Sequence, residues 1–286
     1  MTKLSALTGI WHRRTLLRLG LDDAGIRDGV EGGRYTRVAR GWYAERGFDE
    51  QAAAALRAGG RLSCVAALRL HGAWVTDRRP HVRVARGKPA PPGPIAHRLS
   101  AGMAPPDPTE PIDPLDHALG IAFRCLDDEA MVVAVDSLLS RRVVDLPQAR
   151  GIARAVSKRA LALLDRVDGG SQSGTESIAR LRLRALGLDV RTQVRIGIDR
   201  VDLLVGDRLV IECDSRSHHS RREDYAHDRE RDLRLAQRGY TVLRFTYEQI
   251  MSRWPEVEEA IMTRVRAREH LWSARQLRLL DPFADN

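Results

Sequence analysis

The chain has 286 residues, enough for about two domains, each with a core of its own. Hydrophobic residues make up 43% and charged residues 30%, which excludes a disordered chain. No apolar run is long enough to span a membrane, and the N-terminus lacks the apolar segment of a signal peptide. We therefore expect a cytoplasmic protein without a membrane partner. Its net charge of +9 suits contact with the phosphates of DNA, and a solvated basic surface is the alternative.

Residues 1–48 have the pattern of a winged helix-turn-helix domain. A helical pattern from Leu4 to Leu19 is followed by a second helix, which Asp22 can cap and which continues to Glu31. Residues 34–44 then alternate like the two strands of a wing. A winged helix places its second helix in the major groove. Four arginines are candidates for DNA contact, the first at base edges and the others at phosphates: Arg27, Arg34, Arg37 and Arg40. A helical protein–protein module with a basic rim is the alternative.

Residues 49–168 are predicted to form a mostly helical middle domain with a short sheet. Helices are expected at residues 51–58, 64–71, 115–124, 128–141 and 147–164, and a strand at residues 81–86. No catalytic pattern is evident there. Four histidines of this region are isolated in the sequence, and we expect ordinary core or surface positions for them: His71, His81, His97 and His117. The cysteines Cys64, Cys125 and Cys213 are far apart, so their spacing predicts neither a disulfide framework nor a zinc site.

The third domain, residues 169–286, follows a Gly/Ser-rich segment, residues 168–174, that has the composition of a flexible linker. Its pattern of helix, strand, strand, helix, strand, helix predicts an α/β fold. Lysine is absent from the last 128 residues. A role that is often filled by lysine must be filled there by another residue, and arginine is a poor base because it stays protonated.

The segment from Val201 to His219, VDLLVGDRLVIECDSRSHH, contains the strongest chemical signal. Because strand side chains alternate, Glu212 and Asp214 share one face. A two-residue loop between the two apolar runs would turn Glu212 away from Asp202. A three-residue loop, residues 206–208, would pair Val205 with Leu209 and place Asp202 opposite Glu212.

Three carboxylates on one face of this hairpin would repel one another unless a cation neutralised them. Oxygen ligands favour Mg²⁺ or Mn²⁺, so Asp202, Glu212 and Asp214 are the candidate metal ligands. A solvent-facing hairpin with scattered acids is the alternative. Glu176 fits two roles equally well, as a member of a capping box that begins at Ser173 or as a carboxylate of the metal site.

Further candidates follow the hairpin in the sequence. His218 is placed to accept or donate a proton. Asp228, Arg231 and Asp232 lie near one face of a helix expected at residues 222–238. Arg244 lies in an apolar strand, which is typical of an arginine that pairs with a carboxylate or a phosphate.

These residues, in this order, resemble the very-short-patch-repair (Vsr)-like branch of the PD-(D/E)XK nucleases over about residues 170–252. The resemblance is carried by the following motifs: Glu176, Asp202, Glu212-x-Asp214 with His218, Asp228-x-x-Arg231-Asp232, and Gly239-Tyr240-x-Val242-Leu243-Arg244-Phe245. It implies a mixed sheet flanked by helices and divalent-metal-dependent phosphodiester hydrolysis. It also implies that Asp202 and Glu212 bind the metal, and that Asp214 occupies the usual lysine position.

Residues 1–165 more loosely resemble the N-terminal part of AbiEi-type antitoxins. The similarity rests on Gly20-Leu21, on the run RVARGWYA at residues 37–44 and on AALRLHG at residues 66–72. It implies a winged helix before a helical domain, and transcriptional repression. Two hypotheses follow: a DNA endonuclease or nickase, and a repressor or antitoxin with a non-catalytic nuclease-like domain. An RNA substrate, an oligomer or a toxin-like partner stays open, although nothing in the sequence indicates one.

Overall fold

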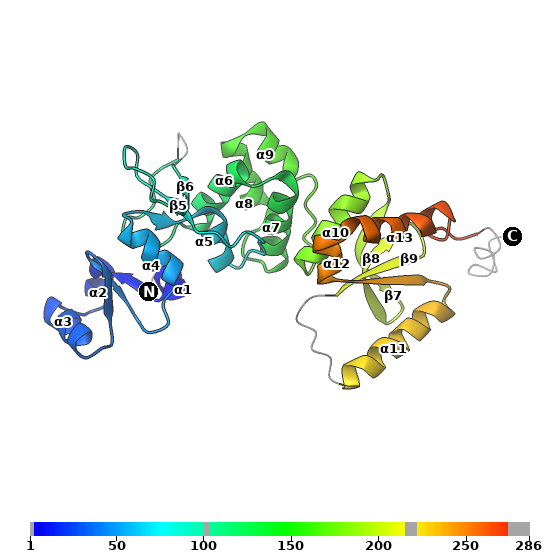
Figure 1. Cartoon of the computed structure of the whole chain (residues 1–286), viewed down its shortest axis with the longest axis horizontal. Coiled ribbons are helices and arrows are strands. Elements are labelled where there is room, and N and C mark those ends of the chain that lie inside the picture. Colours follow the sequence, from blue (N-terminus) through cyan, green and yellow to red (C-terminus); the bar gives the residue numbers. More distant parts are fainter. Residues whose placement is uncertain (1–2, 100–102, 215–221, 274–286) are drawn as a thin grey trace. The chain divides into compact units, whose positions relative to one another are not determined.

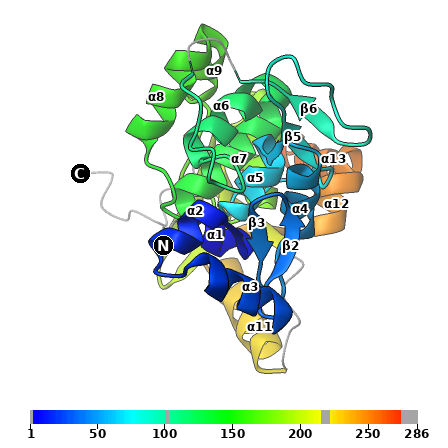
Figure 2. The same ribbon diagram turned by 90° about the vertical axis from the view of Figure 1, so that its left-hand side faces the viewer.

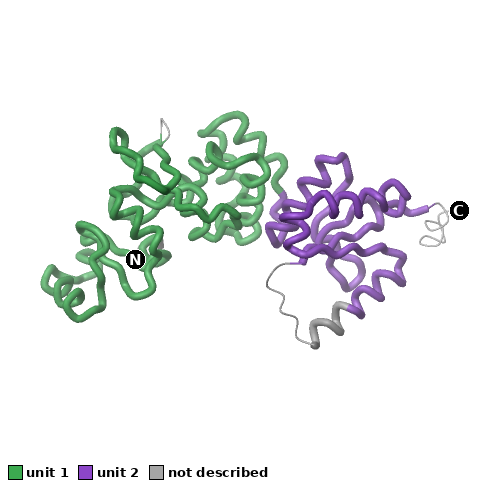
Figure 3. The backbone as a smooth tube through the Cα atoms, viewed as in Figure 1, with its two compact units in different colours: residues 1–167 green, residues 168–286 purple. Residues whose placement is uncertain are grey.

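The computed structural model describes residues 3–99, 103–214 and 222–273. It divides into two compact units, residues 1–167 and residues 168–286, which Figure 3 shows in green and purple. Within the described ranges, no helix combines the length and the apolar character that a bilayer span requires.

Residues 3–44 of the N-terminal unit form a small helical and three-stranded assembly. Its elements are α1 (Lys3–Thr8), β1 (Ile10–His12), α2 (Arg13–Arg18), α3 (Asp23–Glu31), β2 (Thr36–Ala39) and β3 (Trp42–Ala44). The strand order is β1-β3-β2, with both pairings antiparallel. A core of Trp11, Leu16, Ile26 and Tyr35 joins the helices to the strands. The carboxylate of Asp22 accepts the Gly25 N–H at 2.7 Å and caps α3, as its position predicts.

The prediction of one helix from Leu4 to Leu19 is wrong. Gly9 takes a φ of +67°, a conformation that favours glycine, and α1 ends before it. The next three residues are a β-branched residue, an aromatic residue and a histidine, and they pair with β3 as strand β1. Tertiary pairing therefore overrides the helical pattern at this point.

The rest of the N-terminal unit packs helices against a second three-stranded sheet (Figure 1). Its elements are α4 (Glu50–Arg57), β4 (Arg61–Leu62), α5 (Cys64–Leu70), β5 (His81–Arg83), β6 (Ile95–His97), α6 (Leu115–Cys125), α7 (Asp128–Ser140), α8 (Leu146–Val156) and α9 (Lys158–Leu163). The strand order is β4-β5-β6, and β5 and β6 are parallel. The helix predicted at residues 147–164 is two helices, because Ser157 is extended and caps α9 through the Ala160 N–H.

The prediction that four histidines are isolated holds for two of them. His71 contacts the carbonyl oxygen of Asp113, and His117 contacts its neighbour Asp116 and the carbonyl oxygen of Ala104. It is wrong for His81 and His97, whose ring nitrogens lie 2.9 Å apart. The parallel pairing of β5 with β6 brings these two histidines together, and no local sequence spacing records that pairing.

The C-terminal unit is a four-stranded mixed sheet flanked by helices. Its elements are α10 (Gly174–Ala185), β7 (Val190–Ile196), β8 (Asp199–Val205), β9 (Leu209–Asp214), α11 (Arg222–Gln237), β10 (Thr241–Thr246), α12 (Tyr247–Ser252) and α13 (Trp254–Arg266). The strand order is β10-β9-β8-β7, and only the β10–β9 pair is parallel. Figure 1 shows α10, α12 and α13 on one side of this sheet and α11 on the other. Leu235 of α11 is buried in a cluster with Leu204 and Val210.

Two predictions for this unit need correction. The first strand, β7, is missing from the predicted order, because its sequence VRTQVRI places four polar side chains among three apolar ones. The Gly/Ser-rich segment before α10 is not a free linker. The Asp168 carboxylate accepts hydrogen bonds from the Gly170 N–H and the Thr192 hydroxyl, each at 3.0 Å, and Ser171 is buried.

Candidate functional site

The β8–β9 hairpin has the three-residue register that places its acids together. Val205 pairs with Leu209 and Leu203 pairs with Ile211, so one further step along the strands sets Asp202 opposite Glu212. Pairing between the two strands ends at this step. The next N–H of β9, that of Cys213, donates to the Asp202 carboxylate, with 2.9 Å between N and Oδ2. Asp202 is therefore held at the point where the two strands separate.

Glu212 is the most strongly perturbed acid of this site. Its side chain is buried at 5% exposure, and it accepts a hydrogen bond from the Arg231 guanidinium, with 2.7 Å between Nη2 and Oε1. Burial, with the negative charge of Asp202, raises the pKa of Glu212 to about 8, although the charges of Arg231 and Arg244 lower it. The positive charge near Glu212 is therefore insufficient to offset its burial.

Glu176 joins the same site from the first turn of α10. Its backbone N–H donates to the Ser173 hydroxyl at 3.2 Å, which is one half of the predicted capping box. The other half is replaced, because the buried Glu176 carboxylate accepts the Gln172 N–H at 2.9 Å. Burial and the charge of Asp202 raise the pKa of Glu176 above its usual value. Both predicted roles of Glu176 are therefore compatible with its position.

Gln193 of β7 is a polar member of the site that the sequence analysis missed. Its amide donates to Glu176 at 2.7 Å and to Asp202 at 3.3 Å, and so connects the two carboxylates. Its φ is +51°, which is uncommon for a residue other than glycine. A polar residue in the middle of a strand directly before the acidic hairpin is the signal that would have identified it.

The supporting residues of α11 and β10 lie on the same side of the site as Glu212. Arg244 is the register partner of Glu212 and donates to Asp232, with 3.1 Å between Nη2 and Oδ1. Arg231 donates to the Arg200 carbonyl oxygen as well as to Glu212. The structure therefore gathers Arg231, Asp232 and Arg244 around the buried carboxylate.

The structure describes the remaining predicted residues of the hairpin and of α11 only in part. Asp214 ends β9, where it pairs in register with Thr246 and is half-buried. His218 lies outside the described residues. Asp228 lies within α11, but its side chain is outside the described part of the chain. The structure also contains an ion pair that was not predicted, in which Arg234 of α11 donates to both carboxylate oxygens of Asp199 of β8, at 2.6 and 3.0 Å.

The donor set of this site suits a hard divalent cation. It consists of carboxylate oxygens and one amide, which are the ligands that Mg²⁺ and Mn²⁺ prefer. Among the described side chains, these acids do not form a preassembled group of three ligands. Arg231 instead occupies an oxygen of Glu212 through its hydrogen bond. A cation would thus bind Glu212 in place of this arginine.

The predicted DNA-contact arginines belong to the N-terminal unit. Arg27 lies on α3, Arg37 on β2, Arg40 in the β2–β3 turn, and Arg34 before β2. All four are exposed, and the guanidinium of Arg34 lies over the Tyr35 ring at 5.1 Å from its centroid. This arrangement leaves their charges accessible to a polyanion.

A family match concerns the C-terminal unit. A model of the restriction-endonuclease-like family REase_MTES_1575 matches residues 176–268, which begin at Glu176 and include the hairpin. No match is found among the curated proteins. Among solved structures, the chain is similar to the RV2827C protein from Mycobacterium tuberculosis, with 18% identity, a TM-score of 0.27, and coverage of 60% of this chain and 76% of that one. The family match indicates that the C-terminal unit contains a restriction-endonuclease-like domain. Membership of this domain in such a family suggests nuclease activity.

Proposed function

We propose that the protein is a divalent-metal-dependent DNA endonuclease or nickase that hydrolyses phosphodiester bonds. The observation that carries the proposal is the buried Glu212, whose pKa is raised by burial and by Asp202, inside the domain that matches the nuclease family. Carboxylates kept close together away from water favour a divalent cation as their partner. Perturbed acids of this kind are concentrated at functional sites.

Asp202 and Glu212 would hold Mg²⁺ or Mn²⁺, with Asp214 beside them. The bound ion would activate a water molecule and stabilise the negative charge that develops on the phosphate. Gln193 orients the Glu176 and Asp202 carboxylates through its two hydrogen bonds. Arg231 holds the Glu212 carboxyl group through a hydrogen bond before the ion binds, and would then be available to pair with the scissile phosphate. His218 stays the candidate for proton transfer.

Cleavage of supercoiled plasmid with Mg²⁺ or Mn²⁺ tests this proposal. The informative variants are Asp202→Asn and Glu212→Gln, because each keeps an oxygen that can accept the existing hydrogen bond. Asp207→Asn is the matched control, since Asp207 is exposed at the turn of the same hairpin. We expect the wild type and the control to cleave, and each site variant to cleave at least about 100-fold more slowly. Equal cleavage by all four proteins, or none by the wild type, would refute the proposal.

We further propose that α3 and the β2–β3 hairpin act as a winged helix that binds duplex DNA. The support is the set of exposed arginines on these elements, with α3 as the recognition helix. A gel-shift titration of Arg27→Ala and Arg37→Ala tests it. Arg27→Ala should reduce discrimination between sequences, whereas Arg37→Ala should weaken binding to all sequences and reduce the salt dependence. Unchanged binding by the double variant would remove this surface from DNA recognition.

The second candidate function is a repressor or antitoxin whose nuclease-like domain is non-catalytic. The observation that favours it is the contact between Arg231 and Glu212, in which the guanidinium group occupies the place that a metal ion would take. The same experiments separate the two functions. Retention of DNA that depends on Arg27, without cleavage under either metal, would favour the repressor.

A further inference from the structure

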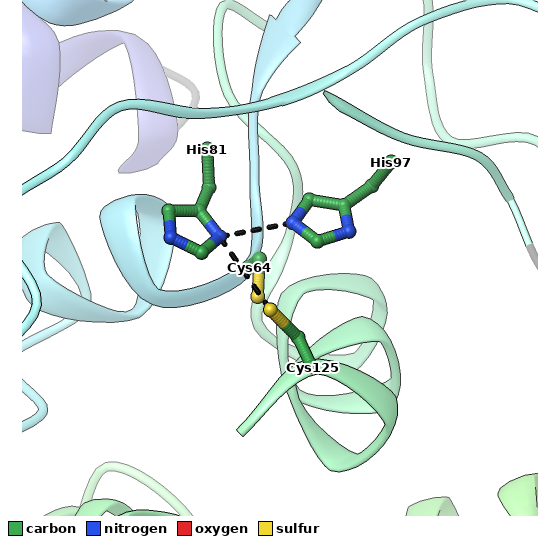
Figure 4. A group of neighbouring side chains, drawn as sticks. All are labelled: Cys64, His81, His97 and Cys125. Atoms are coloured by element: carbon green, nitrogen blue, oxygen red, sulfur yellow. Dashed lines mark hydrogen bonds between the residues drawn. The ribbon is translucent and has the colours of Figure 1, made fainter. Parts of the chain in front are cut away.

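Two cysteines and two histidines meet in the N-terminal unit, far along the sequence from the nuclease-like domain. They come from four elements: Cys64 begins α5, His81 begins β5, His97 ends β6 and Cys125 ends α6. Figure 4 shows the two imidazole rings and the two sulfur atoms facing a common centre. Their nearest ligand atoms all lie within 4.8 Å of one another.

The separations within this Cys₂His₂ cluster are close to those of a tetrahedral metal site. His81 Nδ1 lies 2.9 Å from His97 Nε2 and 3.8 Å from Cys125 Sγ. Zinc with bonds of about 2.0–2.3 Å to nitrogen and sulfur spaces its ligand atoms about 3.3–3.8 Å apart. The cluster therefore needs shifts of no more than about 1 Å to surround one ion.

We propose that Cys64, His81, His97 and Cys125 bind a structural zinc ion. Two sulfur and two nitrogen ligands suit Zn²⁺, and they do not suit Mg²⁺ or Ca²⁺, which prefer oxygen. All four positions are filled by protein atoms, so this site is closed and its role is structural rather than catalytic. On binding, both thiols lose their protons to solvent and each histidine coordinates as neutral imidazole.

A neighbouring carboxylate supports this assignment independently of the four ligands. His81 directs Nδ1 into the cluster, and its other nitrogen, Nε2, lies 3.3 Å from Asp77 Oδ2. Histidines that bind zinc commonly donate their second N–H to a carboxylate in this way, which fixes the tautomer and the ring orientation. Asp77 is itself held by Arg79, with 2.7 Å between Nη2 and Oδ2. Asp77 is therefore a positioning residue for His81.

The cluster lies beside a stretch of the chain that is held by little burial. None of the residues 85–99 is buried, and this stretch includes β6, the edge strand of its sheet. Because so little apolar surface is buried there, the hydrophobic effect contributes little to holding β6 in place. Zinc binding through His97 would fasten β6 to the start of α5 and the end of α6. The four coordinate bonds would thus stabilise a region that lacks a hydrophobic core of its own.

Metal analysis of the full-length protein tests the proposal. The protein is prepared without a histidine tag from zinc-supplied cells, dialysed against excess Mg²⁺, and analysed by elemental mass spectrometry. We expect about one zinc per chain, and tetrahedral Co²⁺ absorption with thiolate charge-transfer bands after exchange. Cys125→Ser and His97→Ala should lose both signals. Cys213→Ala is the matched control, because this buried cysteine of the C-terminal unit lies outside the cluster.

Two further measurements keep the test decisive. Asp77→Asn should retain zinc with an affinity about 10–100-fold lower in competition with a chelator, as expected for a residue that only orients His81. The double variant Asp202→Asn, Glu212→Gln should keep its zinc, which separates this site from the proposed nuclease centre. Wild-type protein without zinc after reconstitution would overturn the proposal. So would zinc that persists in both Cys125→Ser and His97→Ala, or a stoichiometric metal other than zinc.

Discussion

Glu212→Gln is predicted to stabilise the C-terminal unit while it abolishes cleavage. Glu212 has a pKa of about 8 in the folded protein, against an ordinary value of 4.5. Each tenfold change in proton affinity is worth about 1.4 kcal/mol, so the ionised carboxylate costs up to about 5 kcal/mol of folding free energy. Glutamine keeps an oxygen for Arg231 and carries no charge, and it removes this cost.

The sign of the pH dependence follows from the same values. Between about pH 4.5 and 8 the folded protein keeps the proton of Glu212 and the unfolded chain releases it. The contribution of this group to stability is therefore present at low pH and is lost as the pH rises through the window. From about pH 6 to pH 9 the wild type should lose about 3 kcal/mol that the Glu212→Gln variant retains.

Alkylation of Cys213 in a urea series provides a readout at the site. This cysteine is buried on β9 beside Glu212, so it reacts only when the strand opens. Peptide mass spectrometry separates its signal from those of Cys64 and Cys125, and denatured protein corrects for thiol reactivity at each pH. Asp207→Asn, at the exposed turn, should follow the wild type. If Glu212→Gln and the wild type lose equal stability from about pH 6 to pH 9, the reasoning about this carboxylate is refuted.

Three further predictions concern other parts of the molecule. Gln193→Ala removes the amide that connects Glu176 with Asp202, so plasmid cleavage should fall about 10–100-fold while the urea midpoint changes little; unchanged cleavage would exclude an orienting role. Asp113→Asn removes the fully buried carboxylate that pairs with Arg83, and should lower the free energy of unfolding by about 3–5 kcal/mol. Asp165→Asn, which removes a carboxylate from an exposed pair, should have almost no effect. Gly60→Ala would place Cβ 2.5 Å from the Val82 side chain and 2.9 Å from the Arg83 carbonyl oxygen, and should cost about 1–3 kcal/mol in a urea titration; Gly151→Ala, whose Cβ meets nothing within 4 Å, should cost nothing.

The part of the site predictable from sequence is the part built by one hairpin. Two apolar runs separated by a short loop leave two registers open, and the structure has the three-residue loop, in which Val205 pairs with Leu209. Arg244 was also identifiable, because a charge within an apolar strand needs a partner. Local pattern is informative where the interacting residues belong to two strands that are each recognisable in the sequence and are joined by a short loop.

The parts that sequence reasoning missed depend on contacts between distant elements. Gln193 escaped notice because β7 is too polar to be recognised as a strand without its partner β8. The Cys₂His₂ cluster has no short ligand spacing, since each ligand lies at the end of a different element. Packing of α5 against α6 and against β5, together with the pairing of β5 with β6, assembles it. Long-range packing of this kind leaves no periodic signal in the chain.

One oxygen of Asp202 serves as an acceptor for the backbone of the neighbouring strand, where a carbonyl group would ordinarily do so. Replacement by a residue with no oxygen would leave the amide of Cys213 without a partner inside the protein, at a cost of about 1–3 kcal/mol. An inactivating change at this position would therefore also loosen the sheet. A homologue that loses nuclease activity should therefore first lose a side chain whose replacement the fold tolerates. We expect that residue to be Glu212 rather than Asp202.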